Sequence, residues 1–289
     1  MNEKKGNFFV FLGALFWSLN APIVSGINLP PLFLSCYRSL IASIILLPFI
    51  NLKEIKINRY LIIFILSYFG LCSSITIAIK NTSAPIAIGM QYASILWIFI
   101  INFFILNNKE YNKIPAIVLI LIGVILFMTS GNSYSSSKGN AIAFMESIFF
   151  TLMTISSNKL KNINPLGLTS IGNIFTGLIL IIIIGSDRNM IFTLNTKEYT
   201  AVFLLGAVQV ALGYGCYNIG LKYTNSQNAS LIAILEMILG PLWVYIFLHK
   251  GSDLQTLIGF ILIISGLVLN YLISIFIKNK ELKKRAVTE

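Results

Sequence analysis

The sequence predicts an all-α integral membrane protein with ten transmembrane helices, arranged as two inverted five-helix repeats around a central cavity. Three observations lead to this prediction: the composition, the number of apolar runs and a repeat between the two halves. Of the 289 residues, 56% are hydrophobic and 11% are charged, and the mean hydropathy is +0.84. Soluble domains carry about 25% charged residues. The composition therefore favours a chain that lies mostly inside the bilayer.

The apolar runs have the length that a membrane span requires. A hydrocarbon core about 30 Å thick needs about 20 residues of helix, because each residue adds about 1.5 Å. The first run is too long for the apolar core of a signal peptide, which has about 7–15 residues, so we interpret it as the first span. The ten predicted spans are 8–28, 32–51, 60–79, 84–106, 114–131, 140–158, 166–186, 200–221, 226–248 and 255–277.

The basic residues set the orientation of these spans. The chain has 21 Lys and Arg, 10 Asp and Glu and a net charge of +11. With a cytoplasmic N-terminus, fifteen of the basic residues fall in cytoplasmic segments and five in outer segments, and Arg38 lies within a span. By the positive-inside rule both termini are cytoplasmic, in a cell membrane. We therefore expect the basic residues to set the topology, with those of the tail also meeting anionic lipid headgroups, and we expect no nucleic-acid partner.

The two halves of the chain repeat the same motifs. The tripeptide "KGN" precedes both the first and the sixth span, and two longer segments align at an offset that drifts from 133 to 143 residues. The aligned segments are "AIKNTSAPIAI" (78–88) with "GLKYTNSQNAS" (220–230), and "LIGVILF" (121–127) with "ISGLVLN" (264–270). Five spans are an odd number, so the second repeat crosses the membrane in the opposite sense. We expect one repeat in 1–137, the other in 138–278 and a basic cytoplasmic tail in 279–289.

Several segments resemble the drug/metabolite transporter superfamily, of the EamA type. "LPPLFLSCYRSLIASIILLPF" is similar to that family's proline, apolar run, aromatic-Arg and small-residue pattern, with Arg38 at the arginine position. "TSAPIAIGMQYASILWIFI" and "LIGVIL", and again "NASLIAILEMILGPLWVYIFLHKG" and "LIGFILIISGLVL", resemble its fourth and fifth and its ninth and tenth spans. The family usually has a proline within both the fourth and the ninth span. Here Pro241 is present and its counterpart is absent.

The resemblance implies ten helices, cytoplasmic termini and a central cavity walled by spans 1, 3, 4, 6, 8 and 9. Spans 5 and 10 would lie at the periphery. The residues agree with this arrangement independently, because span 5 is nearly pure Ile, Leu and Val while polar residues gather in spans 1, 4, 6 and 8.

Glu236, near the middle of the ninth span, is the main candidate for a functional residue. A carboxylate at mid-bilayer costs at least about 2.5–3.5 kcal/mol, so it faces the bundle interior. Pro241, one turn later, leaves a backbone carbonyl without its helical donor, which a membrane protein tolerates beside protein or cavity water. Glu236 is therefore expected to bind a substrate cation, to exchange a proton during transport, or to tie two helices together.

The fourth and sixth spans supply further polar candidates. The repeat offset places Ser94 opposite Glu236, with Gln91 one turn earlier, either lining the cavity or hydrogen bonding between helices. The sixth span carries a polar stripe at helical spacing that includes Thr154 and Asn158, and such a stripe faces water or a neighbouring helix. Glu146 is a second proton-coupling candidate, or else the ion-pair partner of Arg38, which we assign a structural role.

The first, eighth and ninth spans add aromatic and amide side chains. Trp17, Tyr214 and Tyr217 are expected either to stack on an aromatic or cationic ligand or to pack against one another. Substrate-binding candidates on the same spans also include Asn20, Gln209 and Trp243.

Taken together, these features favour a secondary transporter of small organic solutes, amino acids or related metabolites, that exports them by alternating access. The sequence contains no GxxxxGK[ST] motif, and we expect no cofactor and no metal. The alternatives are a lipid-modifying membrane enzyme, which would need clustered acid–base residues around more than the single His, a facilitator without proton coupling, and a ligand-sensing receptor, for which the loops are too short. The predicted partners are the solute and the bilayer, with a homodimer left open.

Overall fold

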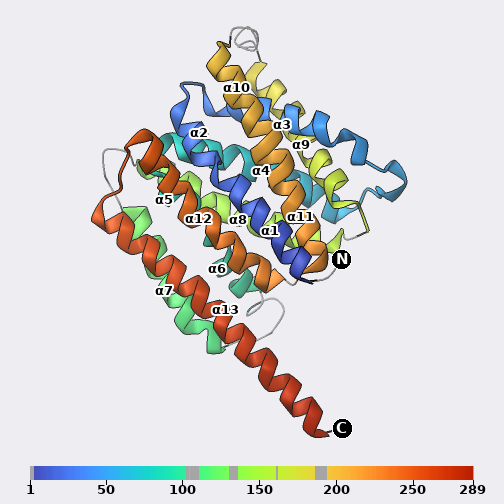
Figure 1. The fold of residues 1–289 in the computed structure, drawn as a ribbon, viewed down its shortest axis with the longest axis vertical. Coiled ribbons are helices and arrows are strands. Elements are labelled where there is room, and N and C mark those ends of the chain that lie inside the picture. The colour runs from blue at the N-terminus through green and yellow to red at the C-terminus, as the bar shows by residue number, and fades with distance from the viewer. Residues whose placement is uncertain are drawn as a thin grey trace.

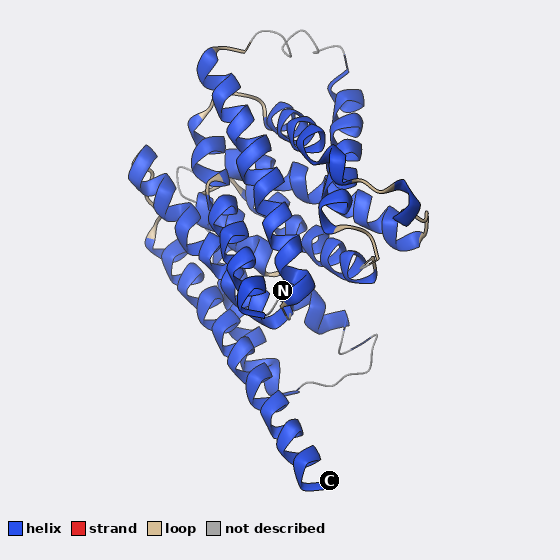
Figure 2. Ribbon diagram, turned by 45° about the vertical axis from the view of Figure 1, so that its right-hand side comes forward, coloured by secondary structure: helices blue, strands red, loops and turns tan. Residues whose placement is uncertain are grey.

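The computed structural model describes residues 3–101, 104, 111–129, 136–160, 162–185, 194–224 and 226–288. Side chains are outside this description at residues 3, 158, 221, 226–231, 234 and 278–288. Within the described ranges the secondary structure is helical and contains no strand (Figure 2).

The helices follow the predicted spans closely, and their bounds show where spans are interrupted. The first five spans comprise α1 (Glu3–Ser18) with α2 (Asn20–Gly26), α3 (Pro31–Leu46), α4 (Arg59–Asn81), α5 (Ala84–Tyr92) with α6 (Ser94–Ile100), and α7 (Ile114–Thr129). The second five comprise α8 (Ser137–Lys159), α9 (Pro165–Ile184), α10 (Thr196–Leu204) with η6 (Leu205–Leu212) and α11 (Gly213–Tyr223), α12 (Ser226–Leu248), and α13 (Leu254–Thr288). Short 3-10 turns η1 (Leu47–Phe49), η2 (Leu52–Glu54) and η4 (Tyr111–Lys113) lie between spans.

Among the described residues, eight helical segments are long and apolar enough to cross a membrane, and Ala84–Ile100 and Leu235–Leu248 are shorter apolar helices. Together they occupy the ten predicted spans, so the prediction of an all-α, ten-helix membrane protein is confirmed. The helix α13 runs past the predicted end of span 10, and its C-terminal part extends away from the rest of the molecule (Figure 1).

Local sequence explains where several helices begin. Asn58 caps α4 by accepting hydrogen bonds from the backbone N–H groups of Tyr60 and Leu61, at 2.9 and 3.0 Å. The helices α3 and α9 both begin with a proline, whose fixed φ suits the first turn and whose missing N–H is not needed there. Polar capping residues and prolines thus determine where these helices begin, which the apolar runs alone do not specify.

The core of the bundle is built from helix pairs that each join one helix of the first half to one of the second. The largest contacts are α1 with α11, α3 with α9, α4 with α8, and α7 with α13. Exchanging the two sets of five spans converts the α1–α11 pair into the α8–α4 pair and leaves the other two pairs unchanged. Figure 1 shows α7 and α13 side by side at one edge of the bundle.

The two spans at this edge are the least buried of the eight long apolar helices. Only 28% of the α7 span and 22% of the α13 span are buried, against 67% of the α4 span. Spans 5 and 10 therefore lie at the periphery, as the sequence predicts, and the interior is formed by the other helices.

Two matching contacts join helix ends of the two halves at the two "KGN" segments. The hydroxyl of Thr82, after α4, donates to Asn140 Oδ1 of α8 at 2.5 Å, and the hydroxyl of Thr224, after α11, donates to Asn7 Oδ1 of α1. Both asparagines belong to the "KGN" repeats. The preceding glycines permit the close approach, because a Cβ on Gly139 would lie 2.3 Å from the Asn81 carbonyl oxygen and one on Gly6 would lie 3.0 Å from Tyr223 Cβ.

Candidate functional site

Three spans leave regular α-helical geometry near their midpoints, and their polar residues are found there. Span 1 is interrupted at Leu19 and span 4 at Ala93, where backbone N–H groups bond three residues back, to Phe16 and Met90. In span 8, η6 is a π-helical segment that carries Gln209. Irregular backbone within a membrane is tolerated where protein or water satisfies it, and π segments are frequent at functional sites. The candidate site is therefore the interior between these three interruptions.

Glu236 of α12 lies in this interior and is 5% exposed. The Tyr92 hydroxyl, at the end of α5, lies 2.9 Å from Glu236 Oε2 and 2.5 Å from the carbonyl oxygen of Ala233, and is placed to donate to either. This contact crosses from the first half of the chain to the second. Tyr92 is thus the group from span 4 that meets Glu236.

Glu146 of α8 is a second buried carboxyl group close to the first. It is fully buried, and neither of its oxygens has a hydrogen-bond partner among the described residues. Glu236 and Arg38 both lie within its electrostatic range. A buried carboxylate without a partner is costly, so it requires a proton or a cation when it is out of water.

Arg38 of α3 joins four spans rather than forming an ion pair with Glu146. Its Nη1 group donates to Asn20 Oδ1 at 3.0 Å and to Gln209 Oε1 at 3.4 Å, and its Nη2 group donates to the Cys72 carbonyl oxygen at 2.5 Å. The Arg38 Nε–H group has no partner, and no carboxylate oxygen of Glu146 lies within 4.0 Å of the guanidinium in the part of the chain that the structure describes. Arg38 and Glu146 are therefore close enough for their charges to interact, but they form no ion pair.

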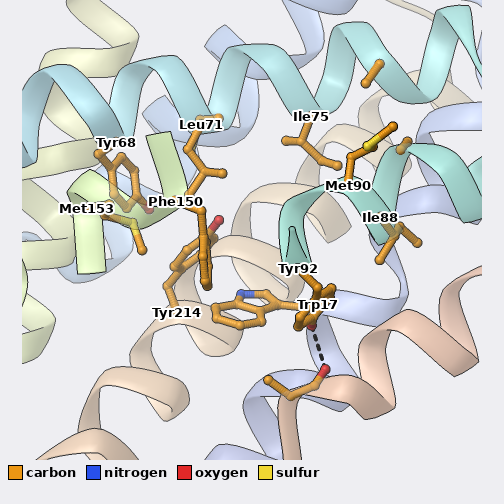
Figure 3. Close-up of a cluster of buried hydrophobic side chains, with 14 of the residues drawn as sticks. Trp17, Tyr68, Leu71, Ile75, Ile88, Met90, Tyr92, Phe150, Met153 and Tyr214 are labelled. Carbon is orange, nitrogen blue, oxygen red and sulfur yellow. Dashed lines mark hydrogen bonds between the residues drawn. The ribbon is translucent and has the colours of Figure 1, made fainter. Parts of the chain in front are cut away.

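Aromatic side chains form one wall of the site. The Trp17 ring centroid lies 4.7 Å from that of Tyr214 and 4.5 Å from that of Tyr217, and Tyr68 lies 5.4 Å from Tyr214. Figure 3 shows Trp17 and Tyr92 at the centre of this buried cluster, with Tyr214 beside the indole. The Trp17 indole N–H has no hydrogen-bond partner among the described residues. The wall thus offers aromatic faces and an unused donor.

Two tryptophans anchor spans 4 and 9 to the first helix of the opposite half. The Trp243 indole N–H donates to Ser18 Oγ at 3.1 Å, and the Trp97 indole N–H donates to Ser147 Oγ at 2.8 Å. Trp243, predicted to bind substrate, therefore has its polar atom engaged by the protein.

The remaining predicted residues lie around this interior, but the structure shows no hydrogen bond between their side chains and Glu236 among the described residues. Gln91 and Ser94 are 5% and 6% exposed, and neither side chain bonds to Glu236; the Ser94 carbonyl oxygen accepts from Thr151 at 3.2 Å. Thr154 is half-buried on α8. The side chain of Asn158 lies outside the described residues. Pro241 lies within α12, which runs through it without interruption.

Sequence reasoning missed Tyr92 and the Cys72 carbonyl. A buried tyrosine usually finds a partner for its hydroxyl, so a tyrosine adjacent to the predicted polar position 91 was an available signal. No side-chain pattern identifies a backbone carbonyl that accepts from an arginine. No group of three His, Cys, Asp or Glu that could hold a metal ion occurs within the ranges described.

A ten-helix bundle with buried carboxyl groups and interrupted central helices is the arrangement expected of a multi-pass membrane transporter, and comparison with known proteins supports that class. The EamA-like transporter family model matches residues 4–129 and again 137–272, so the chain belongs to the EamA-like transporter family. The family expectation drawn from the motifs is thereby confirmed.

Individual relatives share the whole length of the chain. It is 27% identical to an uncharacterized transporter of Clostridium kluyveri, covering 99% of this chain and 98% of the relative. It is 25% identical to the uncharacterized inner membrane transporter YicL of Salmonella typhimurium, covering 93% and 95%. A solved crystal structure has the same fold, with a TM-score of 0.66 at 16% identity and coverage of 92% of this chain and 97% of that one.

Proposed function

We propose that the protein is a secondary transporter that exports small organic solutes, amino acids or related metabolites, from the cell by alternating access. The observation that carries this proposal is the contact between Glu236 and Tyr92. It places a buried carboxyl group of the second half on a residue of the first half, at the point where span 4 is interrupted. Breaking and reforming such a contact is what a transport cycle requires of an interior site.

The packing of the helices supports two inverted five-helix repeats. Each half contains five spans, so the second half begins on the opposite side of the membrane, and the helix pairs are preserved when the halves are exchanged. In such an architecture the outward-open and inward-open forms interconvert when the two halves exchange conformations. Both termini are then cytoplasmic, consistent with the excess of Lys and Arg in the segments assigned to that side.

The interior suits a solute with a cationic group and an apolar body. Glu236 and Glu146 supply two acidic groups against the single guanidinium of Arg38, which is already bonded to Asn20, Gln209 and the Cys72 carbonyl. The ring faces of Trp17, Tyr214 and Tyr217 supply apolar and cation-binding surface beside them. An ammonium group at Glu236, or a proton in its place, neutralises the carboxylate during the cycle.

Transport of labelled amino acids into and out of proteoliposomes, with and without an imposed pH gradient, tests the proposal. Accumulation only with the gradient indicates proton coupling, and equilibration without it indicates a facilitator. Absence of flux for every solute in the panel would contradict the proposed function.

Glu236→Gln in the same assay tests the role of the carboxyl group. The amide cannot release a proton or carry a negative charge, so we expect transport to fall about tenfold or more and to lose its dependence on pH. Glu198→Gln on the surface is the matched control, because glutamine still serves in the capping box at Asn195. Unchanged transport at every pH in Glu236→Gln would leave the residue a structural role only.

A further inference from the structure

A polar pocket lies where α4, α5, α12 and the α12–α13 connection meet, and we refer to it as the Lys80 pocket. It has a volume of about 390 Å³, and its lining includes Lys80, Thr82, Ser83, Pro241, Lys250 and Ser252. It is distinct from the interior site, but Pro241 in its wall is five residues from Glu236 on the same helix, which is about 7.5 Å along the axis.

The charges of the pocket are of one sign. Lys80 and Lys250 are the charged residues in its described lining, and the two ammonium groups lie within electrostatic range of each other. The Lys80 ammonium group donates to the Ile27 carbonyl oxygen at the end of α2, and no carboxylate oxygen lies within 4.0 Å of either lysine among the described residues. Two neighbouring cations without an acidic partner attract an anion.

The backbone and a buried hydroxyl add to this preference. The helix α5 begins at Ala84 in the wall of the pocket, and the first N–H groups of a helix have no partner within it. Pro85 has no N–H, so Ala84 and Ile86 supply the donors of this first turn. The Ser83 side chain, 6% exposed, has a hydroxyl oxygen with no hydrogen-bond partner among the described residues. Helix N-termini favour anions for the same electrostatic reason as the lysines do.

We propose that the Lys80 pocket binds the carboxylate group of the transported solute at the mouth of the path to Glu236. This inference rests on the proposed function and narrows the substrate class to zwitterions. On the export path the ammonium group meets the acidic interior first, and the carboxylate then meets Lys80 and Lys250 one to two helical turns further out. A solute with only one of the two charges lacks one of these interactions.

Binding of acetate to the purified protein tests the pocket without any need for transport. In ligand-observed NMR at constant ionic strength, we expect acetate to bind the unaltered protein and Lys197→Gln, an exposed control. Lys250→Gln should weaken acetate binding about tenfold, as should Lys80→Gln, with recovery in Lys80→Arg. Equal binding in all variants would overturn the proposal.

Lipid phosphate is the other source of an anion at this depth, and nanodiscs distinguish it. We expect acetate to bind equally in discs of phosphatidylcholine and of phosphatidylglycerol. Loss of acetate binding only in phosphatidylglycerol would show that a lipid headgroup occupies the pocket, and would overturn the assignment to solute.

A transport comparison then separates this inference from the proposed function. Labelled leucine and leucinamide differ in the carboxylate alone, and we expect Lys80→Gln and Lys250→Gln to reduce leucine transport about tenfold relative to leucinamide. An equal reduction of both would overturn the pocket's role while leaving the transporter intact. Absence of transport of either solute by the unaltered protein would count against the proposed function, while the acetate result would still decide the pocket.

Discussion

The fourth and ninth spans occupy equivalent places in the two halves, share one contact and differ in another. In both, a tryptophan donates to a serine on the first helix of the opposite half: Trp97 to Ser147 and Trp243 to Ser18. Only the ninth carries a carboxyl group and an interior proline, since the Pro85 of the fourth lies in its first turn, and only the fourth is interrupted. The shared contact belongs to the repeat architecture, whereas the difference concentrates the chemistry on one side of the interior.

The interruption lies where proline is absent. Span 4 breaks at Ala93, beside Tyr92, while α12 continues through Pro241. The break places the Tyr92 hydroxyl against the Ala233 carbonyl and Glu236. Tertiary hydrogen bonds therefore decide the backbone here, and the local propensity of the residues does not.

Tyr92→Phe should produce the largest loss of stability among changes to this pair of spans. It removes the one hydroxyl hydrogen that Tyr92 can donate either to Glu236 or to the Ala233 carbonyl, so a buried acceptor loses that partner. We expect the free energy of unfolding to fall by about 2–3 kcal/mol, measured by denaturation in detergent. Tyr245→Phe, 62% exposed, is the control and should change it little. Equal effects at the two tyrosines would contradict the cross-half contact.

Pro241→Ala should act in the opposite direction. Alanine restores a backbone donor to α12, and a proline within a helix costs about 3 kcal/mol in soluble proteins, less where neighbours compensate. We expect a gain of about 1–2 kcal/mol in thermal or chemical stability, together with slower transport. A less stable variant would show that the proline fits its surroundings better than a regular helix does.

Ser18→Ala and Ser147→Ala test the contact that the two spans share. Each removes the acceptor of one buried indole N–H, so each should cost about 1 kcal/mol, and the two costs should agree. Their free energies of unfolding provide the measurement. Clearly unequal values would mean that the two anchors are not equivalent.

Ser94→Ala should have the smallest effect, although it alters the position aligned with Glu236. The Ser94 hydroxyl makes no hydrogen bond to Glu236, and the contact with Thr151 uses its backbone oxygen. We expect a change within about 0.5 kcal/mol and normal transport. A large loss of transport would place Ser94 in the solute site after all.

The sequence predicts the fold far better than it predicts the site. Length, hydropathy, the two "KGN" segments and the alignment of "AIKNT" with "GLKYT" are sufficient for ten spans, because the thickness of the bilayer restricts span length strongly. The interruption at Leu19 has a local signal, because Pro22 cannot donate to the Ser18 carbonyl four residues back. The interruption at Ala93 has neither proline nor glycine at the break, so nothing local indicates it.

The sequence also does not predict which group each interior charged residue contacts. Glu236 and Arg38 are recognisable as interior charges, but a helical stripe specifies a face and not the atom opposite. The sequence predicts that Gln91 lies near Glu236, but the side chain that contacts Glu236 is that of the next residue, Tyr92. Successive residues of a helix point about 100° apart, so an error of one residue assigns the wrong partner. Arg38 bonds to a backbone carbonyl and two amides, which only tertiary structure brings together.

The helix pairs that join the two halves also bear on how the protein is made. Ribosomes deliver the first five spans to the membrane before α8, α9, α11 and α13 exist, yet these are the partners against which α4, α3, α1 and α7 pack. The early half must therefore wait in the bilayer as inserted but unassembled helices, with Arg38 lacking Gln209 and the Asn7 contact lacking Thr224. The native contacts between the halves therefore form only after the second half has been inserted, and truncation within the second half removes the main packing partners of the first.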